Sequence, residues 1–267
     1  MANEANASHP TPAPKQIRSV LISQPAPLTD KSPYHDLAQR YDVKVDFRQF
    51  IEVQPVSLRE FRKQRINILD HTAVIFTSRN AVDHFFTLCK GLKITIPDDM
   101  KYFCVSEQTA IYLPKYINLR KRKLFVGERT AEDLNKVIAK HKKEKFLFPC
   151  SDIRRDDIPR FLRENNIEHS EAVIYATVSS DLSDLKNVNY DVIAFFSPSG
   201  IKSLFDNFPD FKQNETRIAA FGNSTIKAAT DAGLKCNIEA PTPESPSMTM
   251  ALEKYIIEVN KKQPCDK

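Results

Sequence analysis

The chain has 267 residues, of which 41% are hydrophobic and 27% charged, and its formal net charge is +5. These values are ordinary for a globular protein, and the length favours two domains that each bury a core of their own. No apolar run approaches the ~20 residues that span a bilayer, and the chain has only five glycines, where average usage gives about nineteen. A membrane-spanning protein and a glycine-rich nucleotide-binding loop are therefore excluded.

The two ends of the chain and its cysteines bear on its surroundings. Residues 1–16 are rich in Ala, Asn, Pro and Ser and lack a basic start followed by an apolar run, so we expect a disordered tail rather than a secretory signal. A second short tail is expected at 261–267. The five cysteines are scattered without a CxxC pair, which favours reduced thiols in the cytoplasm over disulfides or a zinc site. We expect no metal.

Short apolar strands alternate with amphipathic helices from residue 17 to residue 257, which predicts βα units built around parallel sheets. The first strand is predicted at Ser19–Ser23 and the first helix at Tyr34–Tyr41. The stretches Val43–Val56 and His169–Ser179 alternate polar and apolar residues, as strands with one wet face do. We interpret these two stretches as a pair of connecting strands.

A long internal repeat accompanies this pattern. The segment AVIFTSRNAVDHFF, which ends at Phe86, matches VIAFFSPSGIKSLF, which ends at Phe205, at an offset of 119 residues. Two further blocks follow in the same order at offsets of 116 and 118, one pairing Thr109 with Thr225 and the other pairing residue 138 with residue 256. The period is too long for a solenoid, so it indicates a duplicated domain.

The order of the elements predicts how the domains are connected. We expect an α/β protein of two similar parallel-sheet (flavodoxin-like) lobes, joined by a two-stranded β-ladder, with a cleft between them. The amino-terminal unit supplies a strand that the second copy of the repeat lacks, so one domain is discontinuous. The predicted boundaries are 17–42 with 181–260 for the first domain, 57–168 for the second, and 43–56 with 169–180 for the ladder.

Polar residues stand where predicted strands give way to helices, which is the edge at which open α/β sheets bind ligands. Hydroxyl and amide side chains at such turns either cap the helix or leave its free N–H groups to bind a carboxylate. A single turn favours capping, whereas the whole set of turns favours multipoint binding of an anion. The candidate binding residues are Ser78, Arg79, Asn80, Thr109, Ser151, Arg154, Ser197, Ser199, Gly200, Asn223, Ser224 and Thr225.

Few side chains indicate ion-pair or acid–base chemistry. Arg79, Arg154 and Arg155 either bind carboxylates through charge-assisted contacts or pair with nearby aspartates on the surface. Tyr175 is an isolated proton donor in the second alternating stretch, although tyrosine is common in strands for packing alone. We interpret His84 as a partly buried packing residue.

Taken together, these blocks resemble the uroporphyrinogen-III synthase family over about residues 17–256. The motifs that carry the resemblance are FTSRNAV, VSEQTA, VIYATV, FFSPSGI, AFGNST and APTPESPSMTMAL. The resemblance implies that the linear tetrapyrrole hydroxymethylbilane, with its eight carboxylates, loses water and closes into a ring with its last pyrrole inverted. It implies no cofactor, and it makes Tyr175 the candidate general acid.

Two turns depart from the family's pattern. The first strand ends in Ser23-Gln24-Pro25 where the family commonly has T-R-P, so one cationic carboxylate contact is missing. Ser106 replaces the glycine of the family's G-x-x-T-A turn, and Glu107 beside it would repel a carboxylate. The binding role of Thr109 is therefore less secure than that of Asn223–Thr225.

Two other classes of function compete with this interpretation. A non-catalytic two-lobed receptor for a small anionic ligand shares the expected cleft. Nucleic-acid binding through the basic stretches 115–123 and 140–145 lacks a recognisable module. We expect a cytoplasmic monomer whose partner is a small-molecule tetrapyrrole, with neither nucleic acid nor membrane as a partner.

Overall fold

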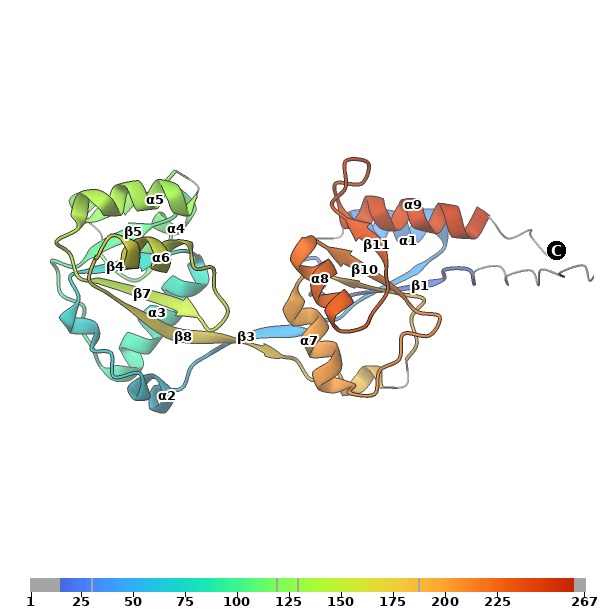
Figure 1. Ribbon diagram of the computed structural model, residues 1–267, viewed down its shortest axis with the longest axis horizontal. Coiled ribbons are helices and arrows are strands. Elements are labelled where there is room, and N and C mark those ends of the chain that lie inside the picture. The colour runs from blue at the N-terminus through green and yellow to red at the C-terminus, as the bar shows by residue number, and fades with distance from the viewer. Residues whose placement is uncertain (1–14, 30, 119, 129, 187, 262–267) are drawn as a thin grey trace, which may run out of the picture. The chain divides into compact units, whose positions relative to one another are not determined.

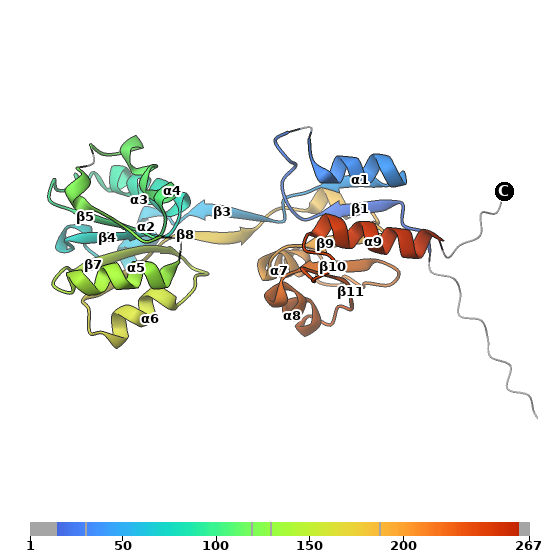
Figure 2. The same cartoon turned by 90° about the horizontal axis from the view of Figure 1, so that it is seen from above.

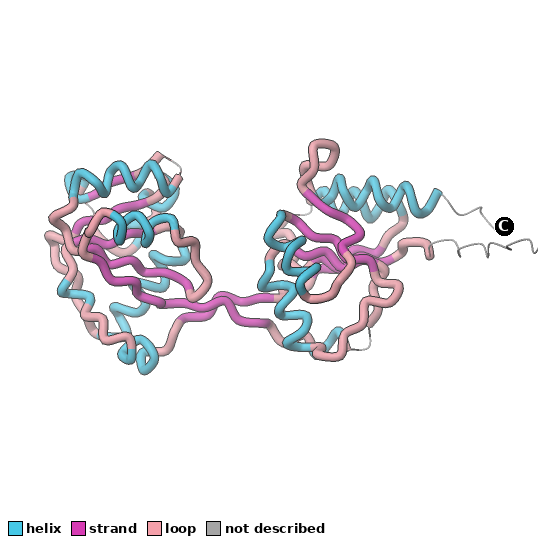
Figure 3. Tube along the Cα trace, viewed as in Figure 1, coloured by secondary structure: helices cyan, strands magenta, loops and turns pink. Residues whose placement is uncertain are grey.

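The computed structural model describes residues 15–261 apart from 30, 119, 129 and 187 (Figure 1). The described residues divide into two compact units, the first made of residues 15–52 with 178–261 and the second of residues 53–177. Strands and helices alternate through both units (Figure 3). Within the described ranges, every helix is too short or too polar to cross a bilayer.

The first unit is built on a five-stranded sheet in the order β11-β10-β9-β1-β2, with parallel pairing throughout. Its strands are β1 (Ser19–Ile22), β2 (Lys44–Phe47), β9 (Val192–Phe195), β10 (Arg217–Phe221) and β11 (Cys236–Ala240). Its helices are α1 (Pro33–Tyr41), α7 (Pro198–Asn207), α8 (Asn223–Asp231) and α9 (Met248–Lys261).

Side chains that alternate along the strands of this sheet pack into two hydrophobic cores, one on each face. Val20 and Ile22 of β1 point to the face that α1 and α9 cover, where they pack with Leu252. Leu21, between them, points to the opposite face and packs with residues of α7 and α8. Helices α1 and α9 lie together on one side of the sheet (Figures 1 and 2). Because both faces are covered, the strands are apolar on both sides, as in other parallel sheets.

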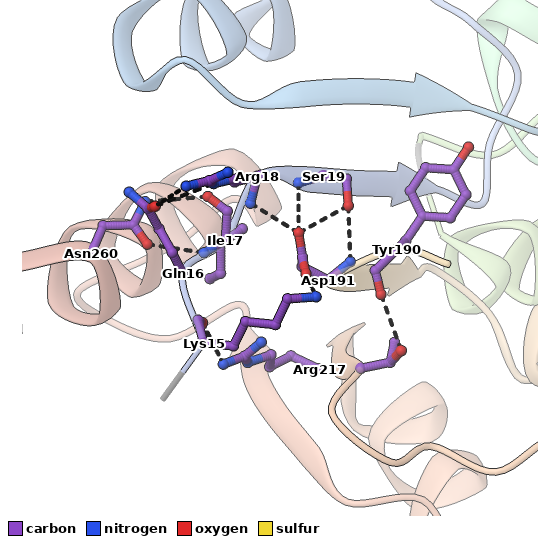
Figure 4. A network of polar contacts seen from close by, with 10 residues as sticks. Lys15, Gln16, Ile17, Arg18, Ser19, Tyr190, Asp191, Arg217 and Asn260 are labelled. Atoms are coloured by element: carbon purple, nitrogen blue, oxygen red, sulfur yellow. Dashed lines mark hydrogen bonds and ion pairs between the residues drawn. The ribbon is translucent and has the colours of Figure 1, made fainter. Parts of the chain in front are cut away.

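A buried carboxylate holds the start of β1 at the amino edge of this sheet (Figure 4). Asp191 is 8% exposed, and its Oδ2 accepts hydrogen bonds of 3.0 Å from the backbone N–H groups of Arg18 and Ser19 and from the Ser19 hydroxyl. Its Oδ1 lies 3.0 Å from the Lys15 ammonium. Arg217 donates to the Lys15 carbonyl at 2.7 Å. The segment before β1 is thereby joined to β9 and β10.

The second unit is built on a six-stranded sheet in the order β3-β8-β7-β4-β5-β6. Its strands are β3 (Ile51–Pro55), β4 (Ala73–Phe76), β5 (Lys101–Cys104), β6 (Leu124–Val126), β7 (Phe146–Ser151) and β8 (His169–Ser179). Its helices are α2 (Leu58–Lys63), α3 (Arg79–Leu92), α4 (Glu107–Ala110), α5 (Ala131–Ile138) and α6 (Asp157–Glu164). One core lies under α2, α3 and α4 and the other under α5 and α6.

The strands β3 and β8 run past each other where the chain passes from one unit to the other. Val56 donates its N–H to the Ile174 carbonyl, and Ser180 donates to the Phe50 carbonyl. Between these two hydrogen bonds the residue number falls by six along β3, from 56 to 50, and rises by six along β8, from 174 to 180. The pairing is therefore antiparallel. The remaining pairs of this sheet are parallel.

The predicted connecting strands take part in the sheets. Within the expected connector 43–56, β2 pairs in parallel with β1, and only β3 pairs with β8. In the same way β8 pairs with β7 over most of its length. The alternating pattern of β2 follows from its two faces, because Val45 and Phe47 pack against the core under α1 and α9, whereas Lys44 and Asp46 form an ion pair. The predicted mixed α/β architecture with parallel sheets is confirmed.

The repeat appears as one sheet order used twice. The order β11-β10-β9-β1-β2 corresponds to β6-β5-β4-β7-β8, with β9 in the place of β4 and β1 in the place of β7. Along the chain the first unit reads 2-1-3-4-5, as in flavodoxin, whereas the second reads 3-2-1-4-5. The two units are thus related by a circular permutation, and the flavodoxin-like order predicted for both applies to the first.

Candidate functional site

A cavity of about 570 Å³ lies at the carboxyl edge of the second unit's sheet. It opens at the carboxyl ends of the neighbouring strands β4 and β7. From β4 the sheet continues to β5 and β6 on one side, and from β7 it continues to β8 on the other. Ligands of open α/β sheets bind at this kind of switch point. The cavity is lined by Thr77, Ser78, Val105, Thr130, Ala131, Glu132, Phe148, Cys150, Ser151, Ile153, Arg154, Arg155, Asp157, Ile158 and Tyr175.

Three helices begin at this cavity. Ser78 caps α3 by accepting a hydrogen bond of 3.2 Å from the Ala81 N–H. Thr130 caps α5 through a capping box with Asp133. Helix α6 begins after Asp156 without a side-chain cap. The positive ends of these helices and the free N–H groups of their first turns favour an anion in the cavity.

The charged side chains of the lining balance one another, with Arg154 and Arg155 on one side and Glu132 and Asp157 on the other. The Arg154 guanidinium is engaged, because it forms an ion pair with Glu171 of β8. Arg155 is exposed and has no hydrogen bond or ion pair with any residue that the structure describes. The lining therefore offers an anion directed donors and the Arg155 guanidinium, but no net positive charge.

Tyr175 brings a phenol into the cavity. A bulge in β8 places Tyr175 opposite Ser151, whereas the preceding pair is Cys150 with Val173, and bulges of this kind re-aim a side chain. The ring stacks on His84 of α3, with centroids 4.9 Å apart and planes at 23°. Burial raises the pKa of Tyr175, and a hydrogen bond with the Ser78 side chain opposes that rise. The phenol is therefore protonated at neutral pH and available as a proton donor.

Asp152 ties the loop after β7 to β8 beside Tyr175. Its backbone N–H donates to the Tyr175 carbonyl at 3.2 Å, and its Oδ1 accepts from the Thr177 N–H at 3.0 Å and from the Ser151 hydroxyl at 2.8 Å. Burial opposes ionisation, but these hydrogen bonds, that from Thr177 first, lower the pKa of Asp152. The ionised carboxylate thus fixes the loop that carries Arg154 and Arg155.

Of the residues predicted for the second unit, the cavity brings together Ser78, Ser151, Arg154 and Tyr175. The others lie outside its lining. Arg79 is exposed and stands over the Tyr112 ring at 5.7 Å, and Asn80 is exposed beside it. Thr109 is 4% exposed, and its hydroxyl lies 3.3 Å from that of Ser106. Arg79, Asn80 and Thr109 are therefore not grouped with the phenol.

In the first unit, the predicted residues lie at the starts of α7 and α8. Ser197 caps α7 by accepting from the Gly200 N–H at 3.2 Å, the same geometry as at Ser78. Ser199 is half-buried and Gly200 buried. A Cβ on Gly200 would come within 3.4 Å of the Phe195 ring, so the helix approaches the strand closely at this glycine.

The start of α8 has no side-chain cap. Gly222 occupies the cap position with a φ of 86°, and no side-chain cap hydrogen bond forms there. Asn223 and Ser224 are exposed in the first turn, while Thr225 is 1% exposed. The Thr225 N–H donates to the Gly222 carbonyl at 3.0 Å, while the N–H groups of Asn223 and Ser224 have no side-chain cap. The Thr225 side chain belongs to the interior, like that of Thr109.

Thr77 and Thr130 line the cavity but were not among the predicted binding residues, whereas Arg155, offered with Arg79 and Arg154 as a carboxylate contact or a surface ion pair, does line it. Thr130 had a signal, since the sequence Thr130-Ala131-Glu132-Asp133 before an apolar helix is typical of a capping box. The sequence does not distinguish Arg155 from its neighbour Arg154 as a carboxylate contact. In the structure they differ because Arg154 forms an ion pair with Glu171. Cys150 also lines the cavity, but burial raises its thiol pKa to about 11, so the thiol stays protonated at neutral pH.

The fold and the cavity define the class of this protein as a two-unit α/β protein with a donor-rich pocket at the carboxyl edge of a parallel sheet. The family model of uroporphyrinogen-III synthase HemD matches residues 32–250. The chain belongs to this uroporphyrinogen-III synthase family, because the match covers most of its length. The predicted family, and with it the prediction of an enzyme that cyclises hydroxymethylbilane, are confirmed.

Individual relatives agree with this assignment. Uroporphyrinogen-III synthase of Saccharomyces cerevisiae is 25% identical over 212 residues, 68% of this chain and 75% of the yeast protein. Porphyrin biosynthesis protein HemD of Ruminiclostridium josui is 26% identical over 204 residues, 69% of this chain and 38% of that protein.

Solved structures of the family share the fold. Uroporphyrinogen-III synthetase from Helicobacter pylori is similar with a TM-score of 0.56 at 20% identity, over 90% of this chain and 99% of that one. A mutant of uroporphyrinogen III synthase from the extremely thermophilic bacterium Thermus thermophilus has a TM-score of 0.50 at 14% identity, over 92% of this chain and 100% of that one.

Proposed function

We propose that the cavity around Tyr175 is the catalytic centre at which this enzyme closes hydroxymethylbilane to uroporphyrinogen III. The observation that carries the proposal is the position of the Tyr175 phenol, which lies in a pocket surrounded by helix N-termini and hydroxyl groups. These donors suit the carboxylates of the substrate, and the phenol suits its leaving hydroxyl.

In the proposed reaction Tyr175 acts as a general acid. The C–O bond to the terminal hydroxyl breaks as the pyrrole nitrogen supplies an electron pair, and the phenol proton goes to the leaving oxygen, which departs as water. The last pyrrole then closes the ring in inverted orientation through a spiro intermediate. The ring carbon that forms the new bond releases a proton, which returns to the phenolate, so one water is lost overall. Burial keeps the phenol protonated until that step.

Substrate folding is the other half of the proposal. The uncatalysed closure gives the unrotated isomer, so the enzyme has to hold the reacting carbons at near-attack distance. In the second unit we assign this role to Ser78, Ser151 and the loop with Arg154 and Arg155. We include the starts of α7 and α8 in the first unit, with Ser197, Ser199, Gly200 and Asn223–Thr225, as further carboxylate-binding turns. Arg79 and Asn80, which are exposed, stay in the proposal as peripheral contacts, and Thr109, whose side chain is buried, only through the backbone of its turn.

Replacement of Tyr175 by phenylalanine tests the chemical role. We expect Tyr175→Phe to lower kcat about 10²-fold with little change in KM, because general acid catalysis typically contributes 10²–10⁴-fold. Chromatography of the oxidised products should show a larger share of the unrotated isomer, since spontaneous closure then competes. The control is Tyr102→Phe, which removes a buried phenol from β5 of the same unit. Wild-type turnover in Tyr175→Phe would refute the assignment.

The non-catalytic receptor predicts a different result, because hydroxymethylbilane would then bind and be released unchanged. The same incubation therefore separates the two functions. That the enzyme works as a monomer in the cytoplasm remains a prediction.

A further inference from the structure

The His84 side chain packs against one face of the Tyr175 ring. The two rings stack with centroids 4.9 Å apart and planes at 23°. Both side chains are half-buried, and they come from different elements, α3 and β8. Sequence reasoning assigns His84 to packing, so the contact with the cavity's phenol adds a second role for it to be tested.

The surroundings of His84 fix where its ring stands. The neighbouring side chains Val82 and Phe85 are fully buried in the core and anchor this turn of α3. Asp83 is held on its own side by the hydroxyls of Tyr112 and Tyr116 and by the Lys115 ammonium, so its carboxylate is already occupied. His84 therefore presents its ring face to β8.

We propose that His84 is a positioning residue for Tyr175, holding the phenol in the orientation in which it delivers its proton; this rests on the proposed function of Tyr175. A tyrosine side chain turns about two bonds, χ1 and χ2. A flat ring lying against one face of the phenol restricts both rotations, while the β8 bulge fixes the backbone from which the side chain starts. Misplacement of a catalytic group by about 1 Å costs up to 10²-fold in rate.

The chemistry of the imidazole agrees with positioning. Burial lowers the pKa of His84, and the nearby Asp83 carboxylate only partly offsets this. At neutral pH the imidazole is therefore uncharged and stacks as an aromatic ring. Phenylalanine at position 84 keeps a flat aromatic face against Tyr175. Leucine keeps a similar side-chain volume but has no flat face.

Two substitutions separate stacking from ionisation, with kcat and KM for hydroxymethylbilane as the readout. We expect His84→Leu to lower kcat about tenfold or more without a comparable rise in KM, and His84→Phe to restore most of that loss. In the double variant with Tyr175→Phe, we expect His84→Leu to cause no further loss, because it acts through the phenol. His84→Asn provides a smaller flat group if the leucine variant unfolds.

The matched control is His141→Leu. His141 also lies against an aromatic ring of the same unit, because its ring centroid is 4.2 Å from that of Phe125. This contact is on the opposite side of the sheet from Tyr175. Its kcat should equal that of the wild type. A loss in His84→Phe as large as in His84→Leu would overturn the proposal, as would additive effects of His84→Leu and Tyr175→Phe. If Tyr175→Phe alone has full activity, the proposed function fails first, and that outcome is seen without any His84 variant.

Discussion

Neighbouring arginines at the cavity have different tasks. Arg154 is bound to Glu171 on β8 and so fixes the loop after β7, whereas Arg155 has no partner among the residues that the structure describes. A hydrogen bond to a charged group is worth about 1.5–3 kcal/mol, and the unpaired guanidinium can form such a bond with a substrate carboxylate.

We therefore expect Arg155→Gln to raise KM for hydroxymethylbilane about tenfold with kcat within about threefold, since about 1.4 kcal/mol corresponds to a factor of ten. Steady-state kinetics check this. The control is Arg59→Gln, which removes an exposed arginine from α2. An unchanged KM in Arg155→Gln would show that backbone donors hold the carboxylates without this cation.

Sequence patterns identify positions better than orientations. The turns after strands predicted Ser78 and Ser151, and the structure places both at the cavity, because the carboxyl ends of parallel strands meet at one edge. The same reasoning chose Thr109, whose side chain is buried. Whether a hydroxyl in a turn faces solvent or the core depends on packing several residues away, which no local pattern contains.

At the scale of a helix, capping and carboxylate binding are separable. Ser197 accepts from the Gly200 N–H, and aspartate caps helices as well as serine does. We expect Ser197→Asp to leave the free energy of unfolding within about 0.5 kcal/mol of the wild type, yet to raise KM severalfold, because its carboxylate repels that of the substrate. Urea unfolding and kinetics measure the two effects.

The control for this substitution is Ser57→Asp. Ser57 caps α2 in the same way, accepting a hydrogen bond of 3.2 Å from the Glu60 N–H, but it lies at the end of β3 rather than at the carboxyl edge of the parallel strands. Its KM should stay at the wild-type value. Equal KM values in Ser197→Asp and wild type would mean that Ser197 serves only to cap α7.

The start of β1 depends on the ionised Asp191 (Figure 4). Burial opposes ionisation, but the hydrogen bonds from Arg18, Ser19 and Lys15 lower the pKa of this carboxyl. A group whose pKa is lower in the folded state stabilises the fold above its unfolded pKa, about 3.9 for aspartate, and loses that contribution as the pH falls through the folded value. Acid should therefore loosen this edge of the first unit.

We expect Asp191→Ala to lower the free energy of unfolding by about 2–3 kcal/mol at neutral pH, because buried donors lose their acceptor. Between neutral pH and about pH 3, the variant should lose less stability than the wild type. Urea titrations at several pH values, followed by circular dichroism, test both effects. Asp231→Ala removes only an exposed pair with Lys227 and is the control. Parallel pH profiles for wild type and Asp191→Ala would contradict this role.

The internal repeat predicted twin folds, and the order of the elements predicted a discontinuous first domain, but neither distinguished the strand orders of the two sheets. Matching Phe86 with Phe205 correctly makes β4 and β9 equivalent strands, each at the same place in the order of its own sheet. The repeat says nothing about β1 and β7, whose loops differ in length and sequence, so the circular permutation was visible only in the sheet order. The β8 bulge was equally hidden, because one extra residue leaves an alternating pattern almost intact.

The wiring predicts that each unit folds alone. Residues 53–177 form one continuous unit with its own cores. In the other unit Ser180 donates to the Phe50 carbonyl at 2.9 Å, so a two-residue Asn-Gly turn can join residues 50 and 180 and keep that hydrogen bond. We expect both pieces to show helical and strand circular dichroism and cooperative thermal unfolding, and neither to cyclise hydroxymethylbilane.

A fragment ending at Cys150 is the control, because it lacks β8 and the last residue of β7 and should not unfold cooperatively. The fragment 53–177 keeps Tyr175, His84 and the whole lining of the cavity. If it folds but has no turnover, the phenol alone is insufficient and the binding turns of the first unit are needed as well. Full activity in 53–177 would remove the first unit from catalysis, and an unfolded fragment would show that the two units stabilise each other.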